Sequence, residues 1–260
     1  MLQGNAVRGR DLSKSGFNGN QLKLIAVAGM LLDHIGVLLI GYGILMEMMP
    51  EQKEYASWYL LYCILRIIGR VAFPIYAFLL TEGFFHTRDW KKYAVRLGVF
   101  ALISEIPFDL LAWQQPVDWR TQNVFFTLFL GLLMLKVLEI MERRLPAQNF
   151  MASEMVPQFS VVCAFCLLAW LVRTDYDYTG ILLIAMFYWF RYNRQKMCCL
   201  GLVWMTVMMG NLFYVPGLAL AFWLIYRYDG TRGSNKGKYA FYWVYPVHLL
   251  VLYGIYRILF

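Results

Sequence analysis

The sequence predicts an all-α protein, a polytopic membrane helix bundle of about nine transmembrane helices, with a range of eight to ten. Hydrophobic residues make up 60% of the 260-residue chain and charged residues only 15%, which is not the composition of a water-soluble domain. The mean hydropathy is +0.52, and apolar runs recur at the length of membrane-spanning helices. These observations exclude an ordinary soluble enzyme and a disordered chain.

Nine apolar segments are the expected spans, because a membrane helix needs about 20 apolar residues. Their expected ranges, in chain order, are 22–46, 58–84, 93–113, 122–141, 156–172, 178–190, 197–209, 212–226 and 240–258. The three segments between 178 and 226 are short or closely spaced, so the expected number of transmembrane helices ranges from eight to ten. Residues 1–21 are polar and are predicted to form a cytoplasmic segment, and residues 22–260 a single transmembrane domain. The first apolar run is too long for a cleavable signal peptide and is predicted to be an uncleaved span.

Basic residues fall mostly in alternate connections between the expected spans. With the amino terminus in the cytoplasm, most of the 24 Lys and Arg residues lie on the cytoplasmic side, as the positive-inside rule requires. This predicts a multi-pass protein of the bacterial cytoplasmic (inner) membrane with membrane lipids as partners. The net charge of +8 then follows from topology, so the sequence predicts no nucleic-acid partner.

The five cysteines lie in or beside apolar runs and predict no disulfide framework. Cys163 and Cys166 form a C-x-x-C motif without a nearby histidine or second cysteine pair. Zinc sites need such additional ligands. The sequence therefore predicts no metal site.

Ionisable side chains inside the expected spans are the candidate catalytic residues. A charged side chain that faces lipid costs about 2.5–3.5 kcal/mol, so these groups must face one another or water. The helical rise places them near the middle and in the outer half of the bilayer. We expect them to converge on one hydrated cavity reachable from both faces. The set comprises Asp33, His34, Arg66, Arg70, Glu105, Asp109 and His248.

Two pairs within this set have helical spacing. Arg66 and Arg70 are four residues apart, so they share one helix face. The same spacing joins Glu105 to Asp109 on the next expected span. We expect the two pairs to meet in interhelical salt bridges. Arginines desolvated beside a cavity also anchor carboxylate, carbonyl or phosphate groups, so a structural and a functional role both remain open.

The first span carries a small-residue face, formed by Ala26, Gly29 and Gly36, around Asp33. Such a face is typical of close helix packing. Asp33 either bonds a neighbouring polar group or assists the adjacent His34, whose imidazole is suited to move protons near neutral pH. His248, which follows Pro246, is either a hydrogen-bonded core residue or part of the active site.

Two further positions are candidate substrate-binding residues. Asn123 begins an expected span and is a candidate hydrogen-bond donor to a developing oxyanion. Asp175 opens the outer turn DYDYTG, residues 175–180, which is a weak candidate for binding a cation. Walker, G-x-S-x-G, HExxH and G-x-G-x-x-G motifs are absent from the sequence.

Several segments, taken together, resemble the TraX family of conjugal-transfer membrane proteins. Their order and spacing cover the chain from 22 to 250. The segments are LKLIAVAGMLLDHIG (22–36), GRVAFPIYAFLLTEGFFHTRDWKKY (69–93), LISEIPFDL (102–110), QNVFFTLFLG (122–131), DYTGIL (177–182) and YPVHLL (245–250).

The resemblance implies an acetyltransferase that uses acetyl-coenzyme A and acts on the amino terminus of a membrane-held pilin or small peptide. The family also resembles polytopic transmembrane acyltransferases, in which a histidine of an early span is required and acyl-coenzyme A approaches from the cytoplasm. His34 matches that histidine. Many relatives are far from any conjugation system, so a small membrane peptide is an alternative acceptor to a pilin.

The residues are compatible with this chemistry. His34 is the candidate base, and Glu105 or Asp109 is expected to orient it, because adjacent helix residues such as Asp33 point about 100° away. Lys91, Lys92 and Arg96 are placed to attract the phosphates of coenzyme A or to anchor the chain at the membrane surface. The buried acids and histidines also fit a proton-coupled transporter. A non-catalytic partner in pilus assembly or pilin processing is the remaining alternative.

Overall fold

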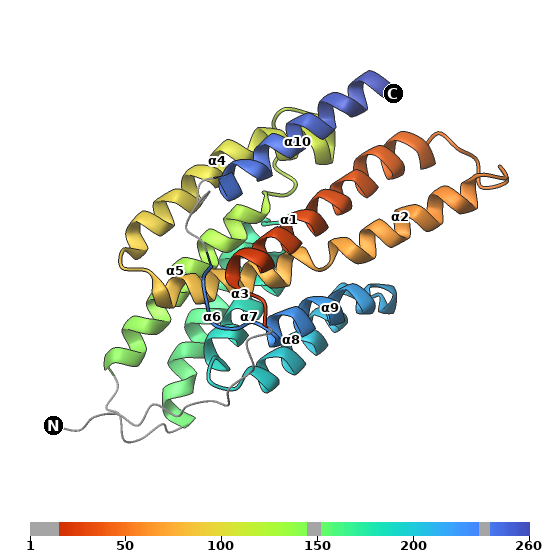
Figure 1. The fold of residues 1–260 in the computed structure, drawn as a ribbon. Helices are drawn as coiled ribbons and strands as arrows, with labels where there is room; N and C mark the ends of the chain where they lie inside the picture. The colour runs from red at the N-terminus through yellow and green to blue at the C-terminus, as the bar shows by residue number, and fades with distance from the viewer. Residues whose placement is uncertain (1–15, 145–151, 234–239) are drawn as a thin grey trace.

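The computed structural model describes residues 16–144, 152–233 and 240–260, and these are built from helices without a β-sheet (Figure 1). Isolated bridges join Phe17 to Tyr228 and Gln122 to Thr174. The elements are α1 (Gly19–Ile35), η1 (Gly36–Leu45), α2 (Tyr55–Gly69), α3 (Ala72–His86), α4 (Trp90–Trp113), α5 (Val124–Arg144), α6 (Ala152–Val172), α7 (Asp177–Trp189), α8 (Arg194–Met209), η2 (Leu212–Tyr214), α9 (Val215–Tyr226) and α10 (Ala240–Leu259). The all-α prediction is confirmed for these residues.

Each expected apolar segment coincides with a helix or with two consecutive helices, but three segments are not continuous α-helices. The segment 212–226 begins with η2, a 3₁₀-helix, before α9. The first segment continues from α1 into η1, a π-helix. The second is interrupted at Arg70 and Val71, between α2 and α3. Pro74 supplies a physical reason for the interruption, because it has no N–H to donate to the carbonyl of Arg70 and fits readily in the first turn of a new helix.

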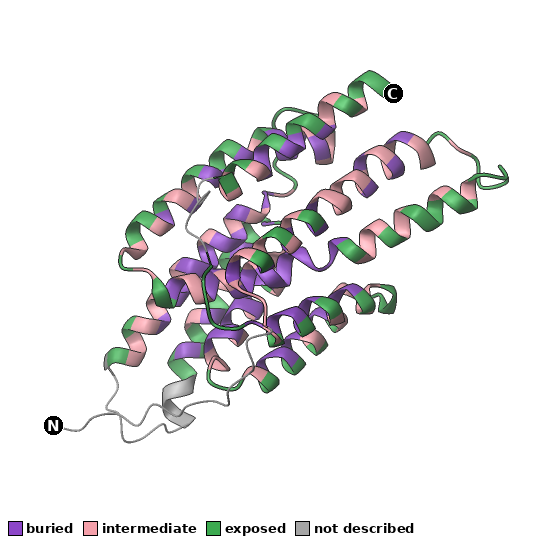
Figure 2. Ribbon diagram, in the orientation of Figure 1, coloured by how far each residue is buried: buried purple, intermediate pink, exposed green. Residues whose placement is uncertain are grey.

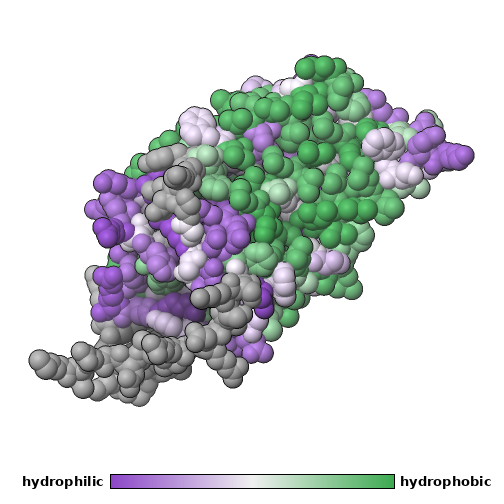
Figure 3. All heavy atoms as spheres, in the orientation of Figure 1, coloured by the Kyte–Doolittle hydropathy of each residue, from purple (hydrophilic) through white to green (hydrophobic). Residues whose placement is uncertain are grey.

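Three helical stretches among the described residues are long and apolar enough to cross a membrane: Gly19–Leu45, Tyr55–His86 and Val124–Arg143. The predicted count of about nine transmembrane helices is not confirmed. Apolar side chains cover much of the face in Figure 3, whereas hydrophilic residues gather where α3 passes into α4 and at the tip of the α1–α2 hairpin. The chain is a membrane protein.

Helix α1 packs against α2, α3 and α10. The expected small-residue face makes this possible: a Cβ atom on Gly29 would lie 3.2 Å from the carbonyl oxygen of Ile68. Buried residues follow the inner faces of the helices (Figure 2). In α7, Ile181, Leu183 and Ile184 are fully buried. The close α1–α2 contact brings the polar residues of these two helices within bonding distance.

The start of α1 is fixed by hydrogen bonds. Asn18 caps the helix and forms a capping box with Gln21. The backbone of Gly19 donates to the carbonyl of Thr231 at 2.8 Å, which ties α1 to the loop after α9. Of the predicted polar segment 1–21, residues 1–15 lie outside the described residues.

Helix α9 crosses the break between α2 and α3 at Gly217. A Cβ atom there would lie 1.9 Å from the carbonyl oxygen of Ile67. We therefore expect Gly217→Ala to lower the free energy of unfolding by about 1–3 kcal/mol through overpacking, measured by thermal unfolding in detergent. The matched control is Gly254→Ala, because a Cβ on Gly254 meets no described atom within 4 Å. Equal stability of both variants would contradict this packing.

Candidate functional site

A cavity of about 1350 Å³ connects the middle of the fold with the corner between α3 and α4. Its lining runs from His86 and Lys92 at this corner to Trp113 at the end of α4. Seven of the sequence-predicted residues line it: Asp33, His34, Arg66, Arg70, Lys92, Arg96 and Asp175. The lining does not include Lys91, Glu105, Asp109, Asn123 or His248. The expected convergence on one cavity therefore holds for only part of the set.

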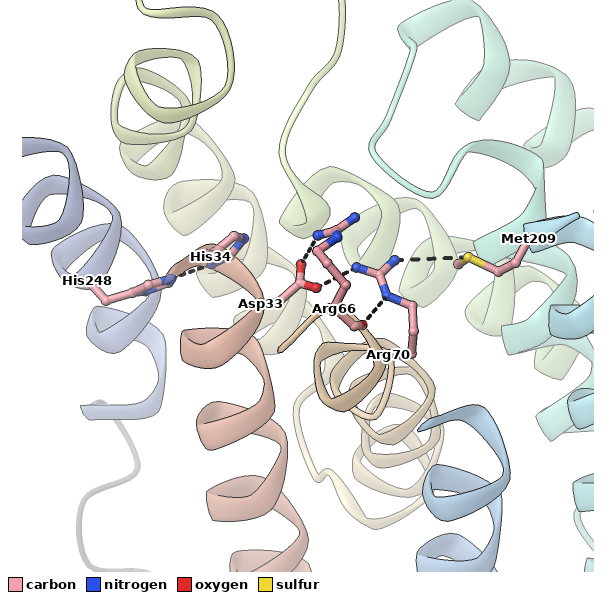
Figure 4. A network of polar contacts seen from close by, with 6 residues as sticks. All are labelled: Asp33, His34, Arg66, Arg70, Met209 and His248. Atoms are coloured by element: carbon pink, nitrogen blue, oxygen red, sulfur yellow. Dashed lines mark hydrogen bonds and ion pairs between the residues drawn. The ribbon is translucent and has the colours of Figure 1, made fainter. Parts of the chain in front are cut away.

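Asp33 is held by Arg66 of α2 and by Arg70, which follows directly after α2 (Figure 4). Its Oδ2 lies 2.6 Å from Nη1 of Arg66 and its Oδ1 lies 2.7 Å from Nη2 of Arg70. Gly69 makes room for the carboxylate, because a Cβ atom there would lie 2.2 Å from Oδ1 of Asp33. Asp33 thus joins α1 to α2 through two charge-assisted hydrogen bonds.

The predicted salt bridges between the arginine pair and the acids of α4 are wrong. Helix α2 packs against α1, whereas α4 packs against α5 and α10. Glu105 instead accepts hydrogen bonds from Asn123, and Oδ2 of Asp109 accepts from the backbone of Asp118 at 2.8 Å. Neither acid orients His34.

Asn123 is also not available as a donor to substrate. Its side-chain amide donates to the carbonyl of Ala101 at 2.8 Å and to Glu105, and its oxygen accepts from the backbone of Phe125 at 3.0 Å. The residue is fully buried. Asn123 therefore joins the start of α5 to α4, which corrects its predicted role in substrate binding.

The arginine pair keeps polar capacity beyond Asp33. Nε of Arg66 is buried without a partner among the described residues. Arg70 donates from Nε to the carbonyl of Arg66 at 3.2 Å and lies over the ring of Tyr214, 5.3 Å from its centroid. Asp175 supplies a second carboxylate to the same cavity. The two arginines and two acids give this part of the wall a balanced charge.

The partner of His34 is His248 on α10. Nδ1 of His34 lies 2.7 Å from Nε2 of His248, and Nδ1 of His248 lies 2.7 Å from the carbonyl oxygen of Val244. The rings are stacked with centroids 4.9 Å apart. His34 lines the cavity, whereas His248 is buried behind it. The imidazole of His34 is therefore held by a second histidine, and the prediction that Asp33, Glu105 or Asp109 holds it is wrong.

Cationic side chains surround the cavity at the α3–α4 corner. The sequence predicted Lys92 and Arg96 there, and the lining adds Lys23, Arg88 and Arg232. Lys23 lies on α1 and Arg232 in the loop after α9, both far along the chain from Lys92 and Arg96. The spacing of basic residues in the sequence therefore gave no signal for either residue.

Asp89 is an acidic residue at the same corner. Its side chain accepts a hydrogen bond from the backbone of Lys92 at 3.0 Å, and this bond lowers the pKa of the Asp89 carboxyl. Asp89 also lies 3.3 Å from Nζ of Lys92. The lining at this corner contains the acids Glu82 and Asp89 but a larger number of basic side chains, and this excess of positive charge favours an anionic ligand.

Comparison with known proteins gives one family. A family model described as "TraX protein" matches residues 18–256. The chain is 32% identical to the probable fimbrial assembly protein FimC, serogroup H1, of Dichelobacter nodosus, over 91% of this chain and 94% of that protein. No solved structure matches the chain.

Removing the carboxylate of Asp33 leaves the half-buried Arg66 and the buried Arg70 without their shared partner. We expect Asp33→Leu to lower the free energy of unfolding by about 3–5 kcal/mol, measured by denaturation in detergent. Replacing Arg66 and Arg70 by Met in that variant should recover most of the loss.

The control is Arg143→Ala, which breaks an exposed ion pair with Glu139 and should cost less than about 1 kcal/mol. An Asp33→Leu variant no less stable than this control would show that the arginines do not depend on Asp33.

Proposed function

Because the chain belongs to the TraX family, we propose that it is an inner-membrane acetyltransferase that uses acetyl-coenzyme A to acetylate the amino terminus of a membrane-held pilin or small peptide. The name of the FimC relative supports a role in pilus assembly. The proposal depends chiefly on one observation: His34 lies in the wall of a large cavity whose other end is cationic. In this proposal the amino terminus and the α3–α4 corner are cytoplasmic.

His34 acts as the general base. A free α-amino group has a pKa of about 7.7–8.0, so it must lose a proton to attack a thioester at neutral pH. The hydrogen bond to His248 uses Nδ1 of His34, which leaves Nε2 to accept this proton. The amine nitrogen bonds to the acetyl carbon and the carbon–sulfur bond breaks. The nitrogen then loses its second proton to the departing thiolate, so that an amide and a free thiol are the products.

The arginine pair stabilises the oxygen of the acetyl group. Negative charge develops on this oxygen as the amine attacks, and preorganised donors in a water-poor site stabilise it. The unpartnered Nε of Arg66 supports such a role. Asp33 keeps both guanidinium groups in place and thus acts through them.

The cationic corner suits the phosphates of the donor. Lys23, Lys92 and Arg96 line the same cavity as His34. Lys23 and His34 are eleven residues apart on α1, about 17 Å at the helical rise. An extended pantetheine arm bridges a gap of this order, whereas a short acyl phosphate does not. Asp175, which lines the cavity near the arginine pair, is the proposed contact for the ammonium group of the acceptor.

We expect His34→Ala to reduce acetyl transfer by about 10²–10⁴-fold, the usual contribution of a general base. The assay is intact-mass spectrometry of small membrane peptides, with labelled acetyl-coenzyme A as donor. The control is Gln195→Ala, an exposed position on α8 outside the cavity lining. Wild-type transfer by His34→Ala would overturn the role of His34. Proton-linked solute flux by the wild type in liposomes without any transfer would favour a transporter.

A second comparison uses two neighbouring lysines. Lys92 lines the cavity and Lys91 does not. We expect Lys92→Gln and Arg96→Gln each to raise the KM for acetyl-coenzyme A about tenfold with a smaller change in kcat, because each removes a charge-assisted contact. Lys91→Gln should keep the wild-type KM. Equal effects of Lys91→Gln and Lys92→Gln would place the phosphates elsewhere.

A further inference from the structure

The hydrogen bonds of the histidine pair also determine which ring nitrogens carry protons, because Nδ1 of His248 faces a backbone carbonyl group. Nδ1 of His248 lies 2.7 Å from the carbonyl oxygen of Val244. A carbonyl oxygen only accepts hydrogen bonds. Nδ1 of His248 must therefore carry a proton, and a neutral His248 carries its lone pair on Nε2.

This lone pair determines the state of the next ring. Nε2 of His248 lies 2.7 Å from Nδ1 of His34, so Nδ1 of His34 must be the donor between the two rings. A neutral His34 then carries its own lone pair on Nε2. Figure 4 shows the two rings joined in this way, with the other ring nitrogen of His34 pointing away from His248.

From these two hydrogen bonds we propose that His248 is a positioning residue that fixes the tautomer of His34, so that Nε2 of His34 is the atom that accepts the proton of the acceptor. This inference rests on the proposed function. It assigns His248 no contact with substrate, consistent with its burial behind His34 and outside the cavity lining.

The surrounding side chains hold the two rings in this arrangement. The ring of Tyr245 meets both imidazoles at an angle, with centroids 6.3 Å from His34 and 5.6 Å from His248. The charged groups near His34 are Asp33, Arg66 and Arg70. Asp33 is held by the two arginines and points away from the imidazole pair (Figure 4). Among the described residues, His248 is the one hydrogen-bond partner of the His34 ring.

Two substitutions separate the hydrogen bond from the ability to take up a proton. His248→Gln places an amide oxygen that can accept from Nδ1 of His34 but does not titrate near neutral pH. His248→Leu removes the acceptor altogether. We expect His248→Leu to lower kcat at least about tenfold, because only about a tenth or less of His34 then keeps both the required tautomer and the required ring angle. We expect His248→Gln to keep kcat within about threefold of the wild type, with the same pH profile.

Any other outcome for these two variants contradicts the proposal. Wild-type kcat and pH profile in His248→Leu would show that His248 does not position His34. A His248→Gln variant as slow as His248→Leu would show that His248 must itself take up a proton. A circular dichroism spectrum and elution volume equal to the wild type confirm that each variant is folded before its rate is compared.

Nitrogen NMR tests the tautomer without any activity. The chain contains only three histidines, so ¹⁵N-histidine labelling of the detergent-solubilised protein gives few signals, and His86→Gln assigns the third. We expect neutral His34 protonated at Nδ1 in the wild type and a mixture of tautomers in His248→Leu. Protonation at Nε2 in the wild type would overturn the inference. The expected spectrum in a protein that transfers no acetyl group would reject the proposed function and leave the tautomer assignment standing.

Discussion

The ion cluster of Asp33, Arg66 and Arg70 is the interaction on which the site depends. Charged side chains in a membrane protein must find partners, because exposure to lipid is costly. Asp33 meets this need for both arginines at 2.6 and 2.7 Å, and it can do so only because Gly69 leaves space for its carboxylate. The same contact holds α1 against α2 beside the break that precedes α3, and it fixes the wall of the cavity.

Neighbouring residues of α1 serve different parts of the structure. Successive side chains of a helix point about 100° apart, so Asp33 faces α2 while His34 faces α10. The charged cluster and the histidine pair therefore lie on different sides of α1: the guanidinium groups are on one side and the two imidazoles are on the other. The general base that we propose therefore needs no carboxylate partner of the kind found in a Ser-His-Asp triad, because His248 and the carbonyl of Val244 hold its ring.

The cavity gives the proposed reaction a direction. Positive side chains from α1, α3–α4 and the loop after α9 gather at one end, and His34 and the arginine pair lie deeper. A long donor with phosphates at one end and a reactive thioester at the other fits such a layout. The acceptor must then reach His34 from elsewhere, and the proposed contact for it is Asp175, which lines the cavity together with Asp177. Membership of the TraX family and likeness to a fimbrial assembly protein agree with a membrane-held pilin as acceptor.

The sequence by itself determined the helical class, the positions of the apolar segments and the importance of the buried ionisable residues, because hydropathy and helical spacing are local properties of the chain. Tertiary structure decided which of these residues are partners. Arg66 and Arg70 bond to Asp33 rather than to Glu105 and Asp109, and His34 bonds to a residue 214 positions away. Such choices depend on which helices lie side by side, and spacing within one helix contains no information about its neighbours.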